Sequence, residues 1–134
     1  MKLRLGLIVV LLSCVCQAEE VDCNNAFTTY EMNTCAAKEV EAANILLEQY
    51  LKKAKEKYAD DAAIFKSIEN GQGAWLAYRT THCDSVREVW SGGSIRGVMT
   101  SGCKLQLTKE RTHTIWADYL TYMDSTPPLL PEPK

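Results

Sequence analysis

Apolar residues recur at intervals of three and four along most of this chain, which is the spacing of one face of an α-helix. Three such stripes cover roughly residues 32–58, 65–90 and 98–123, and short polar or glycine-containing segments separate them. No segment shows the strict alternation typical of a β-strand. Since helices joined by short links pack as antiparallel neighbours, the pattern predicts an all-α, three-helix antiparallel bundle.

Each predicted helix has a start signal. Thr28 and Glu31 match a capping box, in which the Thr side chain accepts a backbone N–H and the Glu side chain reaches back. Asp60 and Asp61 place negative charge at the positive start of the second helix. Ser94 offers a hydroxyl cap to the third. The four prolines after Met123 cannot continue a helix, so residues 124–134 are expected to form a frayed or extended tail.

The N-terminal residues have the composition of a secretory signal. Lys2 and Arg4 precede the apolar run Leu5–Leu12, and residues 16–18 fit a cleavage site. The run is too short to span a bilayer. We therefore predict a signal peptide at 1–18, a helical domain at 19–123 and a Pro-rich tail at 124–134, with a periplasmic or secreted product. Lipidation at Cys14 is the alternative.

The exported chain is mildly acidic. Without Lys2 and Arg4, thirteen basic residues face seventeen acidic ones, a net charge near −4. Nucleic-acid binding requires a basic face, so the charge argues against such a partner. It permits attraction to a basic protein.

Four cysteines remain after removal of the signal, namely Cys23, Cys35, Cys83 and Cys103. An even count in an exported chain of this size predicts two disulfides. A zinc site is disfavoured, because no CxxC pair is present and the two histidines lack ligands at metal spacing. We favour Cys23–Cys35 and Cys83–Cys103, which a helix start and a short turn would bring together. The two crossed pairings stay open.

The sequence carries no pattern that predicts catalysis. No serine lies in a nucleophile motif, and no Gly-rich phosphate loop follows a strand. We therefore predict no enzyme activity, cofactor or metal. Arg79 and Arg111 fall on or beside apolar stripes. A buried ion pair or carbonyl bonding, with Glu39 or another acid, is the structural interpretation. An anion site is the functional one.

An ordered set of residues resembles the LprI-type lysozyme-inhibitor domain family of exported bacterial proteins. The set comprises Cys23, Thr29, Glu31-Met32-Asn33, Cys35, Glu39, Gln72, Ala74-Trp75, Tyr78-Arg79, Cys83, Gly92-Gly93-Ser94, Cys103, Leu107-Thr108 and Arg111. The chain departs from the family at Ala42–Leu46, where an acidic residue is missing, and at Gly73. The resemblance implies a helical, disulfide-bonded protein that inhibits a lysozyme in the cell envelope. We expect a monomer, with a basic lysozyme as its partner. An envelope interaction or immunity-like module with another partner is the alternative.

Lysozyme cleaves with two carboxylates in a cleft, so an inhibitor gains from a narrow protrusion with donors or a cation. In a three-helix bundle only the turns protrude. The turn at residues 90–97 offers an aromatic ring, hydroxyls, free backbone N–H groups and one cation. We therefore expect Ser94 and Arg96 to reach the cleft and Trp90 to pack on its rim. A plain interhelical turn is the alternative interpretation.

Overall fold

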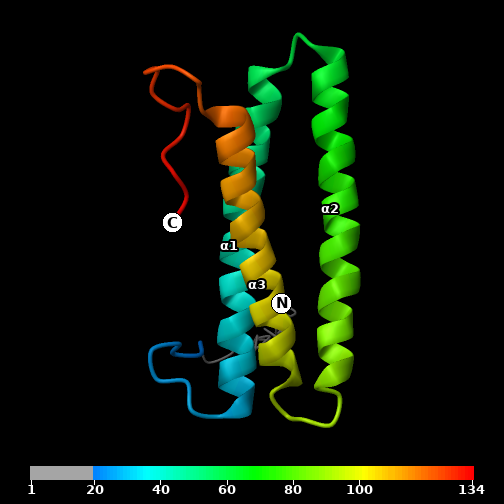
Figure 1. Cartoon of the computed structure of the whole chain (residues 1–134). Helices are drawn as coiled ribbons and strands as arrows, with labels where there is room; N and C mark the ends of the chain where they lie inside the picture. Colours follow the sequence, from blue (N-terminus) through cyan, green and yellow to red (C-terminus); the bar gives the residue numbers. More distant parts are fainter. Residues whose placement is uncertain (1–19) are drawn as a thin grey trace, which may run out of the picture.

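The computed structural model describes residues 20–134 and confirms the all-α, three-helix antiparallel bundle. Figure 1 shows α1 (Thr29–Lys57), α2 (Ala62–Val89) and α3 (Arg96–Ile115), followed by the π-helical turn η1 (Trp116–Leu120). The described part of the chain contains no strand. The expected signal peptide and Cys14 lie outside the described residues. No helix among residues 20–134 is long and apolar enough to cross a membrane.

Two of the three predicted helix caps are confirmed. At the start of α1, the Glu31 backbone N–H donates to Thr28 Oγ1 at 3.2 Å, and the Thr28 N–H donates to Glu31 Oε2 at 2.8 Å. At the start of α2, the Asp61 carboxylate accepts two backbone N–H groups of the first turn, each at 3.0 Å. These bonds satisfy donors that a helix start would otherwise leave unpaired.

The predicted Ser94 cap is wrong. The residue that flanks α3 is Ile95, and no side chain caps this helix. The reason is a turn that continues one residue further than the sequence indicates, since the Arg96 N–H donates to the Gly93 carbonyl at 3.3 Å. Ser94 therefore lies within the turn, where it is exposed.

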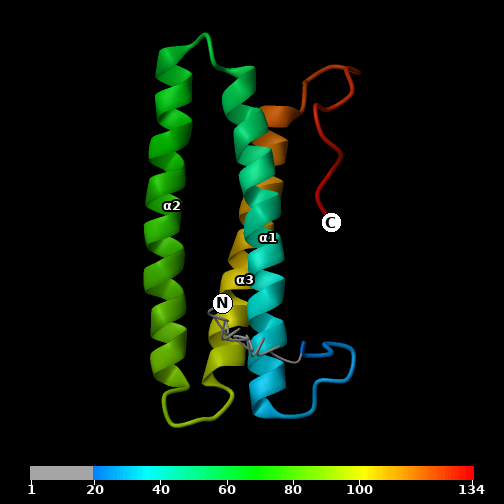
Figure 2. The same cartoon turned by 180° about the vertical axis from the view of Figure 1, so that it is seen from behind.

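The core lies mainly between α1 and α3. Its buried side chains are Leu47, Tyr50, Leu51, Ala54, Ile68, Ile115 and Leu120. Buried Thr108 and Thr112 let the two helices approach, because each hydroxyl is satisfied by the carbonyl one turn earlier, at 2.7 and 2.9 Å. In α2 only Ile68 and Cys83 are buried. Figures 1 and 2 accordingly show α2 standing apart from the closely paired α1 and α3.

The tail after Thr121 is extended, but it is docked against the bundle rather than frayed. Tyr50 Oη donates to the Pro131 carbonyl at 2.7 Å, and Trp116 Nε1 donates to the Leu130 carbonyl at 2.9 Å. Leu130 also packs against the core. The prolines prevent a helix, so the carbonyls of Leu130 and Pro131 are free to accept from these two aromatic side chains. Of the two expected forms, the tail is therefore extended and not frayed.

Candidate partner-binding site

Two disulfides hold one end of the bundle. Cys23–Cys35 ties the segment before α1 to that helix, and Cys83–Cys103 joins α2 to α3. The Cα atoms are 5.5 and 5.7 Å apart. Figure 1 shows that the start of α1 and the α2–α3 turn lie at the same end. The favoured pairing is thus confirmed, and both crossed pairings are excluded.

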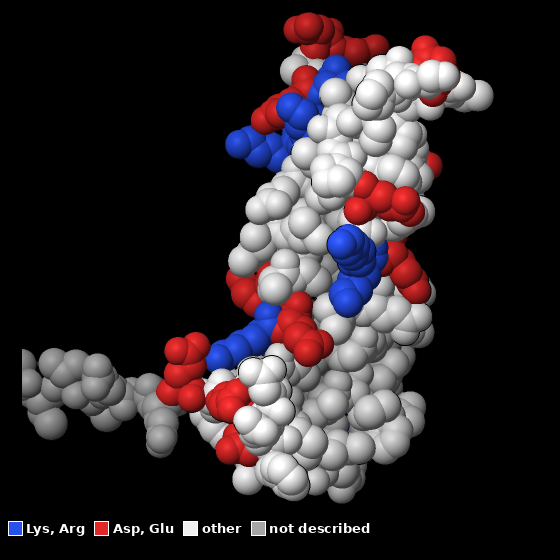
Figure 3. Space-filling view, turned by 90° about the vertical axis from the view of Figure 1, so that its left-hand side faces the viewer, with Lys and Arg blue, Asp and Glu red and all other residues white. Residues whose placement is uncertain are grey.

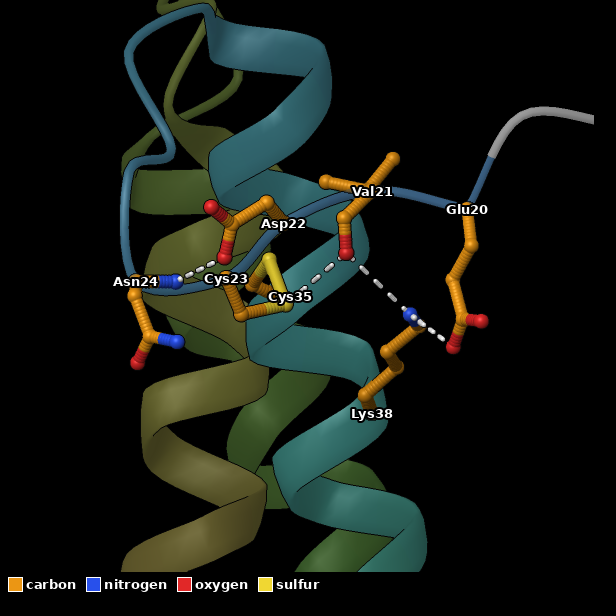
Figure 4. Close-up of polar contacts among 7 residues, drawn as sticks. All are labelled: Glu20, Val21, Asp22, Cys23, Asn24, Cys35 and Lys38. Carbon is orange, nitrogen blue, oxygen red and sulfur yellow. Dashed lines mark hydrogen bonds and ion pairs between the residues drawn. A yellow bond between two sulfur atoms is a disulfide. The ribbon is translucent and has the colours of Figure 1, made fainter.

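The segment before α1 is held closely against the helix (Figure 4). Lys38 Nζ lies 3.5 Å from the Val21 carbonyl and 3.6 Å from Glu20 Oε1. The Asp22 carboxylate accepts from the side chain of Asn25 at 2.8 Å and from the Asn24 N–H at 2.9 Å. These bonds stabilise the carboxylate and lower the pKa of Asp22 below its ordinary value.

The α2–α3 turn carries all three contact residues predicted from the sequence. Trp90 and Ser94 are exposed, and Arg96 is half-buried with its Nη1 3.5 Å from the Ser91 carbonyl. The Gly93 N–H donates to the Trp90 carbonyl at 3.0 Å, which closes the turn. The structure therefore brings these residues together at the protruding end, but the Arg96 side chain folds back toward the turn.

The start of α1 lies directly beside the start of α3. A side chain at Gly97 would overlap Asn33, so only a glycine allows this approach without a shift of the neighbour. The contact places Phe27 and Tyr30 at the same end as the turn, and both are strongly exposed. An apolar residue just before a helix cap usually packs on the first helical turn as a hydrophobic staple, yet Phe27 remains 90% exposed.

Phe27 and Tyr30 are not among the contact residues predicted from the sequence. The capping motif at Thr28 and Glu31 accounts for the polar residues around them. The helical spacing gives no indication that these two aromatic side chains lie outside the core. The one available signal was the unusual position of two aromatic residues on either side of a polar cap.

Arg79 is a structural residue with neutral partners. Its Nη1 donates to Asn44 Oδ1 and to Thr108 Oγ1, each at 2.7 Å, and its guanidinium stacks 4.8 Å from the Trp75 ring centre. Burial lowers the pKa of Arg79. The predicted ion pair with Glu39 or another acid is therefore wrong. Neutral oxygens supply the acceptors, which avoids the cost of desolvating a carboxylate.

Arg111 has the same kind of environment. Its Nε donates to Gln72 Oε1 at 3.1 Å, and its guanidinium lies 5.9 Å from the Trp75 ring centre. Glu39 lies elsewhere, lining a cavity of about 380 Å³ between α1, α3 and the tail, together with Lys109. The two arginines therefore cross-link α2 to its neighbours, and the acid predicted as their partner faces a different surface.

Acidic side chains border the disulfide-bonded end on the face that carries the tail (Figure 3). Figure 3 shows the face that carries the tail, and there the lower end is largely uncharged while acidic side chains gather just above it. The described residues contain no cluster of three or more His, Cys, Asp or Glu side chains arranged to hold a metal ion. The feature that this end offers is thus a rigid surface with exposed aromatic groups.

Comparison with known proteins shows similarity to one protein family. The model of the family described as lysozyme inhibitor LprI matches residues 22–115. A protein of Rhizobium meliloti (strain 1021), described as uncharacterized protein R02472, is 29% identical over 107 residues, which cover 72% of this chain and 77% of that protein. No solved structure shows a significant match. The matched region begins at Asp22, contains all four cysteines of the two disulfides and ends before the tail.

Proposed function

The chain belongs to the lysozyme inhibitor LprI family, and from this we propose that it is an extracytoplasmic inhibitor that binds a lysozyme and blocks cleavage of peptidoglycan. The family match is the observation that carries the proposal. Two disulfides support the location, because such bonds persist in oxidising compartments outside the cytoplasm. The family is described as an inhibitor rather than an enzyme, and we accordingly assign no catalytic role to any residue.

The geometry of the α2–α3 turn supports a direct block of the cleft. A glycosidase with two carboxylates presents negative charge where the sugar binds. Ser94 supplies an exposed hydroxyl, and Arg96 supplies the cation once its long 3.5 Å contact to the Ser91 carbonyl is released. Trp90 would pack on the rim, as aromatic residues do in many interfaces. The Cys83–Cys103 bond keeps the ordering cost of this contact low.

A lysis assay tests the proposal. The oxidised protein spanning Glu19–Lys134 is titrated into a C-type lysozyme that is clearing a peptidoglycan suspension. We expect dose-dependent inhibition that saturates near one inhibitor per enzyme. A matched reaction uses an amidase that cleaves the peptide stems of the same wall, and its rate should not change. Equal inhibition of both enzymes would show that the protein coats the wall, and no inhibition of lysozyme would contradict the proposal.

A further inference from the structure

The disulfide-bonded end gathers large apolar side chains that face solvent. Phe27 is 90% exposed, Tyr30 73%, Val89 81%, Trp90 38% and Ile95 37%. Phe27 lies just before α1 and Tyr30 in its first turn, whereas Val89 ends α2, and Trp90 and Ile95 lie in the α2–α3 turn. Single exposed apolar residues are normal, but several at one end of a small protein mark an interaction surface.

Other exposed large apolar residues are distributed differently. They lie along the helices, in the tail or at the opposite end, at Ile45, Ile64, Leu76, Tyr78, Tyr122, Met123 and Leu129. Among them, Tyr78 already stacks on His82, with ring centres 5.5 Å apart. The five at the disulfide-bonded end differ in that two disulfides hold the segments that carry them.

We propose that Phe27 and Tyr30 join the α2–α3 turn in a single docking surface, the end surface (Phe27, Tyr30, Val89, Trp90 and Ile95), and that lysozyme is its occupant. This inference rests on the proposed function. It extends the contact from the turn to the start of α1, which lies beside the start of α3 through the Gly97–Asn33 approach. Lysozyme is then bound by two elements, not by one loop.

The charges beside the end surface favour a basic occupant. A cavity of about 380 Å³ is lined by Tyr30 and by three acidic residues, Glu20, Asp22 and Glu31, of which Glu20 is paired with Lys38 at 3.6 Å. Backbone N–H groups of Thr28 and Phe27 lower the pKa of Glu31, so its carboxylate is ionised at neutral pH. An aromatic ring with neighbouring carboxylates suits a Lys or Arg side chain. These groups complement the basic lysozyme that the acidic net charge also favours.

The end surface is also held in place before binding. Cys23–Cys35 fixes the segment that precedes Phe27, and Cys83–Cys103 fixes the two helices that flank the turn. A preorganised surface loses little conformational freedom on association, which raises the affinity obtained from a modest area. Rigid aromatic anchors are the side chains that most often dominate such interfaces.

The test is calorimetric binding of C-type lysozyme to the oxidised Glu19–Lys134 protein and its variants. The variant Phe27→Ser with Tyr30→Ser leaves the Thr28–Glu31 cap intact, and we expect it to bind at least about tenfold more weakly. The control is Ile45→Ser with Met123→Ser, which removes two exposed apolar side chains elsewhere. It should change affinity by less than about twofold. Phe27→Leu with Tyr30→Phe should retain most of the affinity, and thermal melts confirm that each variant is folded.

The outcomes separate the two proposals. If the unaltered protein binds lysozyme and the Phe27→Ser, Tyr30→Ser variant binds equally well, the proposal that the end surface binds lysozyme is overturned, while the proposed function stands. A control variant that weakens binding as much as the end-surface variant would also overturn it. If the unaltered protein does not bind lysozyme, the proposed function fails and this inference fails with it.

Discussion

At the scale of single residues, the two arginines inside the bundle keep their charge and bond to neutral acceptors. Arg79 and Arg111 bond to Asn44, Thr108 and Gln72, which are all neutral. The sequence identified both arginines as unusual, because each interrupts an apolar stripe. It could not identify their partners, since Asn44 and Thr108 are 35 and 29 residues from Arg79 and their heights depend on how the helices are offset.

Arg79→Ala tests this neutral pairing. The substitution leaves Asn44 Oδ1 and Thr108 Oγ1 without their donor and should lower the free energy of unfolding by about 1–3 kcal/mol. If Arg79 were instead paired with a buried carboxylate, its removal would leave that charge unpaired and would cost more, about 3–5 kcal/mol. Urea unfolding measures the difference, with exposed Arg87→Ala as the control. A loss indistinguishable from that of Arg87→Ala would contradict the assigned role.

Glu31 should make stability depend on acid pH. Its pKa in the folded protein lies below the ordinary value of 4.5, chiefly because the Thr28 and Phe27 N–H groups bond to the charged carboxylate. A lowered folded pKa stabilises the protein above the unfolded value, and this stabilisation is lost as the pH falls through the folded pKa. Melting temperature should therefore fall below about pH 4.5. Glu31→Gln should show a shallower fall, and an unchanged acid profile would argue against this cap.

At the scale of elements, the observed bounds of α1 agree best with those predicted from the sequence, and the bounds of α3 agree least. The capping box set the start of α1, whereas α3 begins at Arg96 without a side-chain cap and continues into the π-helical η1. Local signals could not locate that start, because backbone bonds of the turn determine it. The apolar stripe of α2 predicted a helix correctly. The polar residues Gln72 and Arg79 in this stripe did not indicate that only two residues of α2 would be buried.

Two glycines provide a matched test of how the helices approach. Nothing lies within 4 Å of a Cβ added at Gly73, so Gly73→Ala should stabilise the protein by up to about 1 kcal/mol through helix propensity. Gly97→Ala would overlap Asn33 and should destabilise it by about 1–3 kcal/mol. Denaturant unfolding of both variants measures the two values. Equal effects of the same sign would contradict the close approach of α1 and α3 at Gly97.

At the scale of the whole molecule, the docked tail is the largest departure from the sequence-based expectation. The prolines correctly indicated an extended segment, but the acceptors for Tyr50 Oη and Trp116 Nε1 are backbone carbonyls, which no residue pattern identifies. The bundle and both disulfides were predictable from helical spacing and cysteine positions. The turn residues Trp90, Ser94 and Arg96 were found together, while Phe27 and Tyr30 required knowledge of where α1 begins beside α3.

Removal of residues 124–134 tests the contribution of the tail. Loss of Leu130 and Pro131 leaves Trp116 and Tyr50 without their acceptors, so unfolding should become easier by about 1–3 kcal/mol. Trp116 should also gain water contact and shift its fluorescence to longer wavelength. Lysozyme binding should not change, because the tail lies away from the disulfide-bonded end (Figure 2). Weaker lysozyme binding by the truncated protein would place the contact on the tail face instead.

Hydrogen–deuterium exchange with and without lysozyme tests the central claim most directly, because it reports which backbone segments the enzyme covers. The turn at 90–95 and the segment at 23–28 lie outside the helices and should exchange faster than the helix interiors in the free protein. Saturating lysozyme should slow exchange in both segments and leave the α1–α2 link at 58–61 unchanged. Protection confined to other surfaces, or no protection at all, would contradict binding of lysozyme through the disulfide-bonded end.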